Sequence, residues 1–134
     1  MRIRFQLLIA AALAVTAAPV LAHHSYVAEY DITDTVVLKG TLSSFEWRNP
    51  HAFLTIAVKD VSGATKPWRV EGGPLWFLMD GGWSPEMLQE LMKSRDVIVV
   101  TGYRARKTPD AGFGGGVLGT EIEFSDGRKL LFHD

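Results

Sequence analysis

Residues 35–48 form a long segment of β-type sequence whose apolar side chains change phase along its length. The apolar residues fall into two sets, one of Val36, Leu38 and Leu42 and the other of Val37, Phe45 and Trp47. The change from one set to the other occurs around Gly40. A change of phase around a glycine is typical of a β-bulge or a sharp coil. The segment therefore predicts one long strand that serves two parts of a curved sheet.

The rest of the pattern predicts shorter strands and one helical connection. Strands are expected at 52–60, around Arg69, and at 96–103, 117–124 and 128–132, with a Gly-rich loop at 108–116. Short helices are expected after Pro74 and after Ser84, which is a typical helix-capping residue. Helices between the third and fourth strands favour a mainly β, five- to six-stranded OB-like barrel over residues 35–134. A split β-sandwich is the alternative.

The N-terminal residues have the order of a secretory signal peptide. Arg2 and Arg4 precede an apolar run at 5–15, and small residues follow at 16–22. The run is shorter than the ~20 residues that a membrane-spanning helix needs. We therefore expect cleavage after Ala22 and a periplasmic product, with an uncleaved N-terminal anchor as the alternative.

Composition narrows the functions open to the remaining chain. Removal of 22 residues would leave 112 of the 134, with 12 basic against 15 acidic side chains and a net charge of −3. This balance argues against nucleic acid as a partner. The chain has no cysteine, which excludes disulfides and thiolate ligands. After residue 22 no apolar segment is long enough to span a membrane, so we expect a polar arm at 23–34 followed by one barrel domain.

Cleavage after Ala22 would make His23 the first residue of the product, followed by His24. An N-terminal histidine offers an amine and a ring nitrogen as a chelating pair, and nitrogen ligands in this arrangement suit Cu(II). His51, at the start of the second strand, is the leading third ligand, and His24 or His133 could take its place. The alternative is that these histidines are structural residues or part of a solvated arm.

A second candidate site is the junction between the first two strands, where polar functional groups are dense. Such a rim suits recognition of a small ligand or a protein partner. The alternative is a structural corner in which the charged side chains pair with each other and the amide caps the turn. The candidate ligand-binding residues are Glu46, Trp47, Arg48 and Asn49, with Glu71 from the neighbouring strand.

Several short motifs give the chain a resemblance to a known family. They are His-His-Ser-Tyr at 23–26, Glu-Tyr-Asp at 29–31, Lys-Gly-Thr at 39–41, Phe-Glu-Trp-Arg-Asn-Pro-His at 45–51, Val-Glu-Gly-Gly at 70–73 and Val-Thr-Gly-Tyr at 100–103. With these motifs the chain resembles a family of small exported bacterial proteins that is described only as a domain of unknown function. The resemblance implies a periplasmic location and a barrel-like fold, and it supplies no catalytic role.

Together these observations predict a periplasmic, non-enzymatic binding protein with a candidate copper site at His23, His24 and His51. Its partners would be a metal ion or small ligand, or a periplasmic protein. A metal-free module that binds through the rim at residues 46–51 is the alternative. A copper oxidoreductase is a third hypothesis, disfavoured because a small barrel offers little surface for a substrate.

Overall fold

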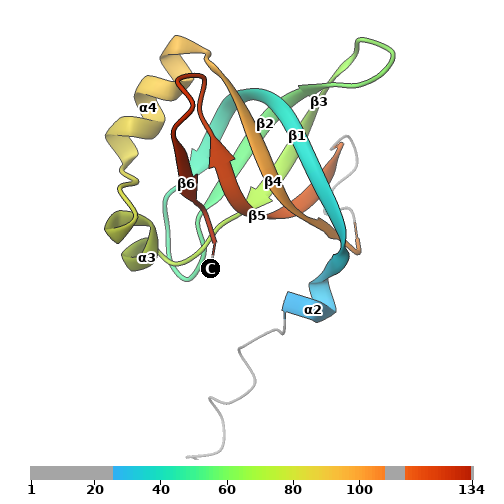
Figure 1. Cartoon of the computed structure of the whole chain (residues 1–134), viewed down its shortest axis with the longest axis horizontal. Coiled ribbons are helices and arrows are strands. Elements are labelled where there is room, and N and C mark those ends of the chain that lie inside the picture. The colour runs from blue at the N-terminus through green and yellow to red at the C-terminus, as the bar shows by residue number, and fades with distance from the viewer. Residues whose placement is uncertain (1–25, 108–113, 134) are drawn as a thin grey trace, which may run out of the picture.

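The structure is a computed structural model that describes residues 26–107 and 114–133. Its elements, in chain order, are α2 (Tyr26–Glu29), β1 (Tyr30–Glu46), β2 (Phe53–Lys59), β3 (Thr65–Glu71), α3 (Leu75–Asp80), α4 (Pro85–Ser94), β4 (Val97–Ala105), β5 (Gly115–Glu123) and β6 (Lys129–Leu131). Figure 1 shows α3 and α4 together on one side of the strands, and α2 apart from them. The helical connection therefore lies between the third and fourth strands, where the sequence predicts it.

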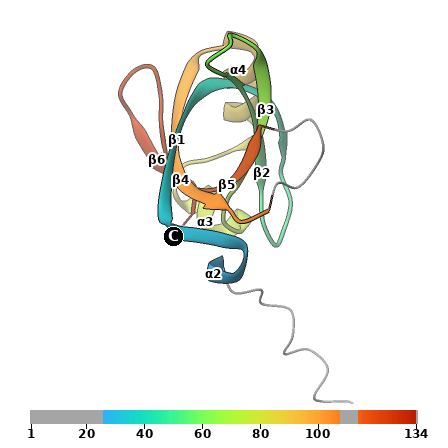
Figure 2. The ribbon, with the colours of Figure 1, turned by 90° about the vertical axis from the view of Figure 1, so that its right-hand side faces the viewer.

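The strands form a closed barrel. Their order is β3-β2-β1-β4-β5-β6, and all neighbouring pairs in this order are antiparallel. A parallel pairing between β3 and β5, from Trp68 opposite Gly115 to Glu71 opposite Leu118, closes the ring. The strands appear as a ring in Figure 2. The predicted OB-like barrel is thus confirmed, with five strands in the ring and β6 as an extra strand on β5.

The irregularity in β1 lies at a different residue from the expected one. Gly40 is in regular register with both neighbours, opposite Val58 of β2 and Ile98 of β4. The register shift against β2 falls between Leu42 and Ser44 instead. An extra residue at this point explains why apolar side chains change phase after Leu42. A Cβ on Gly40 would lie 2.2 Å from the Ala57 carbonyl oxygen, so glycine is required here by close packing of the strands.

Two boundaries also differ from expectation. β1 begins at Tyr30, so residues 30–34 of the expected arm belong to a strand that pairs with the end of β4. β5 begins at Gly115, inside the expected Gly-rich loop. A Cβ on Gly115 would lie 2.5 Å from the indole of Trp68, so the absence of a side chain allows the closing strand to lie against that ring.

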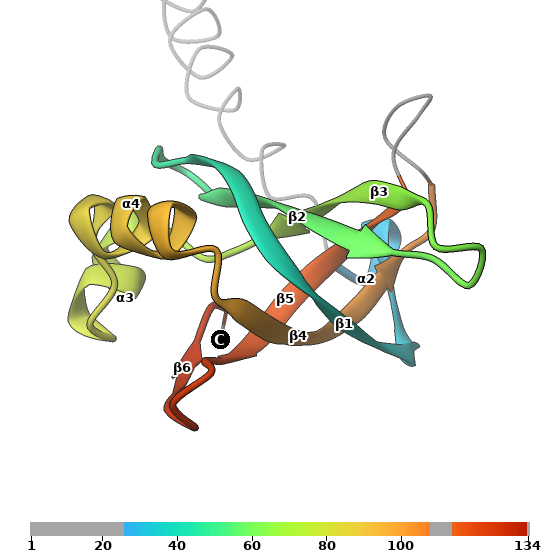
Figure 3. The same cartoon turned by 90° about the horizontal axis from the view of Figure 1, so that it is seen from above.

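The core fills the barrel and continues under the helices. Alternate residues of the strands point inward, and α4 contributes Leu88 and Leu91. Ser84 caps this helix by accepting a hydrogen bond from the Met87 amide at 3.2 Å. Figure 3 shows α3 and α4 at one end of the barrel. Among the described residues, no helix combines the length and the apolar character needed to cross a membrane.

Candidate functional site

Backbone hydrogen bonds draw three distant segments together at one edge of the barrel. The Gly72 amide donates to the Ala52 carbonyl at 2.8 Å, and the Ala52 amide donates to the Gly73 carbonyl at 3.2 Å. The Gly73 amide in turn donates to the Phe132 carbonyl at 2.7 Å. The connection before β2, the end of β3 and the C-terminal segment therefore meet. On each of the three segments, a residue next to this junction has a titratable side chain.

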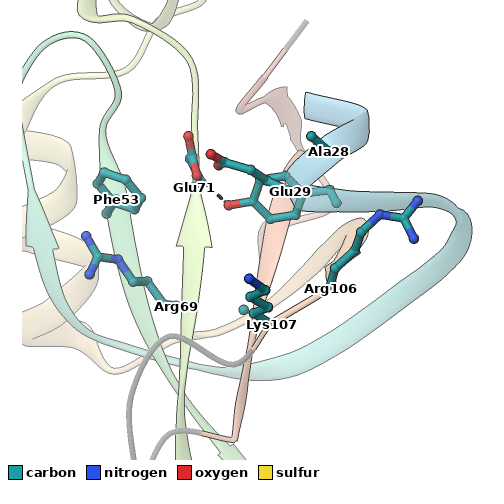
Figure 4. A pocket seen from close by; sticks show the side chains of 9 residues that line it. Ala28, Glu29, Phe53, Arg69, Glu71, Arg106 and Lys107 are labelled. Atoms are coloured by element: carbon teal, nitrogen blue, oxygen red, sulfur yellow. Dashed lines mark hydrogen bonds between the residues drawn. The ribbon is translucent and has the colours of Figure 1, made fainter. Parts of the chain in front are cut away.

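These side chains are His51, Glu71 and His133. Glu71 is the last residue of β3 and is buried, with 8% of its surface exposed. One of its carboxylate oxygens contacts Nδ1 of His51, and the other accepts a short hydrogen bond from the Tyr30 hydroxyl. The latter bond is the dashed line beside Glu71 in Figure 4. The carboxylate is therefore held at both oxygens.

The Tyr30 phenol remains protonated in this arrangement. Burial raises its pKa well above the usual value, and the hydrogen bond to Glu71 and the charge of that carboxylate raise the pKa further. Tyr30 is consequently a fixed donor to Glu71. With one oxygen occupied by the phenol, the other faces the imidazole of His51.

Contact with Glu71 at Nδ1 leaves Nε2 as the ring nitrogen of His51 available to a ligand. Metal-binding histidines commonly have this arrangement, in which a carboxylate holds one ring nitrogen and the metal takes the other. His51 is partly accessible, with 29% of its side chain exposed. The imidazole thus has a fixed orientation and an open side.

Aromatic contacts place the start of the described chain against this histidine. The ring centroids of His51 and His133 are 6.3 Å apart. The Tyr26 ring packs edge-on against His133 at 4.5 Å and stacks on His51 at 5.8 Å. Within residues 26–107 and 114–133, no group of three His, Asp or Glu side chains is close enough together to hold a metal ion. A metal ion bound at His51 would therefore need ligands from outside the described residues.

The position of Tyr26 is stabilised by contacts between α2 and the end of β4. The Arg106 amide donates to the Glu29 carbonyl at 2.8 Å, and Arg106 Nε donates to the Val27 carbonyl at 3.1 Å. The two predicted ligands His23 and His24 lie outside the described residues, three and two positions before Tyr26 in the sequence.

The predicted rim residues are largely engaged with each other or with the fold. Glu46 forms ion pairs with Arg48 at 2.9 Å and with Arg69 at 3.2 Å. Trp47 packs against the hydrophobic core. Asn49 Oδ1 accepts a hydrogen bond from the Leu75 amide at 3.0 Å, at the start of α3. Glu71, grouped with this rim from the sequence, contacts His51 and Tyr30 instead.

Sequence reasoning identified His51 and Glu71 but did not pair them, and it missed two tyrosines. Tyr26 and Tyr30 lie in two of the motifs that carry the family resemblance, but neither was selected as a site residue. His133 entered only as a substitute ligand. The Gly-Gly pair after Glu71 was the available clue, because two adjacent glycines after a strand allow other chain segments to approach closely.

Residues 11–114 match the family described as "Family of unknown function (DUF6152)". No curated protein is significantly similar to the chain in sequence. One solved structure with a detectable likeness is an OBody bound to hen egg-white lysozyme. It has 19% sequence identity, covers 68% of this chain and 80% of its own, and gives a TM-score of 0.38. A likeness at this level bears on neither the detailed fold nor the function.

Proposed function

The chain belongs to DUF6152, a family of unknown function, and from the chemistry of its own residues we propose that it is an exported, periplasmic copper-binding protein. In this proposal Cu(II) is bound by His51 together with the N-terminal histidines His23 and His24. The observation that carries the proposal is the contact of His51 Nδ1 with the buried Glu71 carboxylate. That contact orients the imidazole and leaves Nε2 to bind the metal.

The location of Tyr26 supports a contribution from the N-terminal histidines. Tyr26 lies against both His51 and His133. Because consecutive Cα atoms are 3.8 Å apart, the Cα atoms of His24 and His23 are within about 8 and 11 Å of the Cα of Tyr26. Chain length therefore permits the amine and ring of His23 to reach His51 once cleavage after Ala22 has freed the amine.

The available ligands favour copper over other metals. The proposed donors are all nitrogens, from imidazole rings and the terminal amine, and the chain has no cysteine to supply a thiolate. Amine and imidazole nitrogens suit the tetragonal geometry of Cu(II), which also has the highest affinity among the divalent first-row metals. The ring of His133, 6.3 Å from that of His51, supplies a further nitrogen ligand or a wall of the site.

The first test is a Cu(II) titration, followed by EPR, of protein expressed from the full sequence, exported and purified without a tag. Mass spectrometry is expected to show His23 as the first residue. We expect a one-to-one complex with nitrogen hyperfine structure and a Kd below roughly 1 μM, a threshold of about 8 kcal/mol that separates a built site from a flexible His-His arm.

Two changes test the ligand set. One glycine added before His23 separates the terminal amine from the first imidazole, and it is expected to abolish tight binding. Glu71→Gln is expected to weaken copper binding about 10- to 100-fold, because it removes the carboxylate that orients His51. Glu46→Gln is the matched control, since it neutralises a carboxylate that does not contact His51.

The extended variant alters only the chain end, so it keeps the test decisive even if Glu71→Gln disturbs folding. Tight copper binding that survives the extension would contradict the proposed ligand set. The absence of binding tighter than roughly micromolar to the protein that begins at His23 would contradict the copper function itself.

A further inference from the structure

The Glu71 side chain is fixed at its backbone by two strands and at its far end by a tyrosine. In the sheet, Glu71 lies opposite Phe53 of β2 and Leu118 of β5. Its side chain has several rotatable bonds, so a fixed backbone does not by itself fix the plane of the carboxylate. The hydrogen bond from the Tyr30 hydroxyl, drawn in Figure 4, supplies a second point of attachment. The place of the oxygen that contacts His51 therefore depends on Tyr30.

Tyr30 suits this role because the fold holds it firmly. It is the first residue of β1, has 7% of its surface exposed and lies opposite Ala105 of β4. The backbone just before it is held at the same end of β4, where the Arg106 amide donates to the Glu29 carbonyl at 2.8 Å. A buried phenol on a paired strand has little freedom to move. Its hydroxyl is thus a donor with a fixed location.

The same arrangement determines where the proton of the His51 ring lies. A carboxylate accepts hydrogen bonds and does not donate them, so a Glu71 carboxylate in contact with Nδ1 requires a hydrogen on that nitrogen. In the neutral imidazole the other nitrogen, Nε2, then carries the free electron pair. The tautomer of a histidine is set by the hydrogen bond that one of its ring nitrogens makes. The contact with Glu71 therefore selects the tautomer that presents Nε2 to a metal ion.

We propose that Tyr30 is a positioning residue that acts through Glu71 to hold His51 in the tautomer with hydrogen on Nδ1. Tyr30 does not itself bind the metal, because its hydroxyl is used by Glu71. The use of the open Nε2 as a copper ligand rests on the proposed function. The tautomer of His51, in contrast, is a property of the protein before any metal binds.

The first test measures this tautomer by NMR in the metal-free protein. Protein expressed from the full sequence is labelled with nitrogen-15, kept metal-free with EDTA and studied at about pH 8.5, where an ordinary histidine is neutral. Long-range proton–nitrogen correlation spectra distinguish a ring nitrogen that carries hydrogen from one that does not. The signals lost in His51→Asn identify those of His51. We expect hydrogen on Nδ1 and none on Nε2.

Two variants separate the hydroxyl of Tyr30 from its ring. Tyr30→Phe keeps the ring, and it is expected to leave His51 as a mixture of both tautomers, because Glu71 loses one of its two attachments. The matched control is Tyr103→Phe, which removes the same group from a partly buried tyrosine of β4. In the described part of the chain Tyr103 is not a hydrogen-bond partner of Glu71, so the spectrum of His51 should not change.

Copper titration measures the consequence for the metal. Tyr30→Phe is expected to weaken Cu(II) binding about fivefold, the effect of one typical hydrogen bond, and Tyr103→Phe is expected to leave it unchanged. The effect of Tyr30→Phe should vanish in a Glu71→Ala background, because no carboxylate is left to position. A role in folding alone would lower the affinity by the same factor in both backgrounds.

Three outcomes would overturn the proposal. Hydrogen on Nε2 of His51 in the unmodified protein would show that Glu71 is the donor in their contact. An unchanged tautomer in Tyr30→Phe would show that Glu71 needs no second attachment. An equal loss of copper affinity with and without Glu71 would show that Tyr30 does not act through it. Absence of copper binding to the unmodified protein would overturn the proposed function alone, because the tautomer is measured without metal.

Discussion

Gly40 stands where β1 is paired with two strands at once, Val58 on one side and Ile98 on the other. At this position the backbone of β2 comes close to that of β1. The space beside the Gly40 Cα is filled by the Ala57 carbonyl group and the Ile56 side chain. The barrel therefore depends on the absence of a side chain at this position.

Gly40→Ala is expected to destabilise the protein by about 2–3 kcal/mol, because its Cβ would clash with backbone that cannot move without breaking the sheet. Urea denaturation followed by circular dichroism measures the change. Lys39→Ala is the control, since Lys39 is exposed in the same strand. Equal stability of the two variants would contradict the close approach of β1 and β2.

At the same scale, the candidate site was only partly predictable. His51 and Glu71 could be selected as individual residues, because both lie in motifs rich in functional groups. Their contact depends on the register between β2 and β3, which sets Phe53 opposite Glu71. It also depends on hydrogen bonds between segments far apart in sequence. Neither the register nor these bonds can be read from local sequence pattern.

Helix α4 shows what local chemistry determines at the scale of an element. Ser84 at the cap, Pro85 in the first turn and apolar residues at helical spacing all indicate the same helix, and the helix begins at Pro85. Its buried residues Leu88 and Leu91 extend the barrel core. Such an element is predictable because the residues that determine its start and its buried face lie close together in the sequence.

Ser84→Ala is expected to lower the free energy of unfolding by about 1 kcal/mol, since the Met87 amide would lose its side-chain acceptor. Comparison of urea midpoints at constant m-value detects a change of this size. Gln89→Ala, an exposed change within the same helix, should have little effect. A loss of stability in Gln89→Ala as large as that in Ser84→Ala would argue against the cap.

Strand ends were less predictable than the helix, for reasons that lie in tertiary packing. The start of β5 at Gly115 depends on the Trp68 indole in another strand. The start of β1 at Tyr30 depends on pairing with the end of β4, where Ala105 lies 75 residues later in the chain. Neither partner can be identified from the residues around the strand end.

For the molecule as a whole, the C-terminal segment joins the barrel to the helical connection. Phe132 is fully buried and packs on the Trp83 ring at 5.2 Å between centroids. Trp83 Nε1 also donates to the Leu131 carbonyl at 2.8 Å. Trp83 belongs to the turn between α3 and α4, so these contacts anchor both helices. A barrel without disulfides relies on such packing for its stability.

Phe132→Ala is therefore expected to destabilise the whole domain by about 3–5 kcal/mol, because it leaves a cavity that the anchored segments cannot close. The neighbouring Leu131→Ala, at a side chain that is 57% exposed, should change stability by less than about 0.5 kcal/mol. Thermal and urea denaturation of both variants provide the comparison. Similar losses in the two variants would show that Phe132 is not an anchor.

Tyr26 and His133, at the two ends of the part of the chain that the structure describes, are in ring contact. This has a practical consequence for anyone who purifies the protein. A polyhistidine tag at the C-terminus would begin two residues after His133 and would supply competing imidazoles beside His51. If His23 is the first residue, as we propose, a tag before it would block its amine. Under the proposed copper function both tags would interfere with the ligands, so untagged protein is needed for a measurement of metal content.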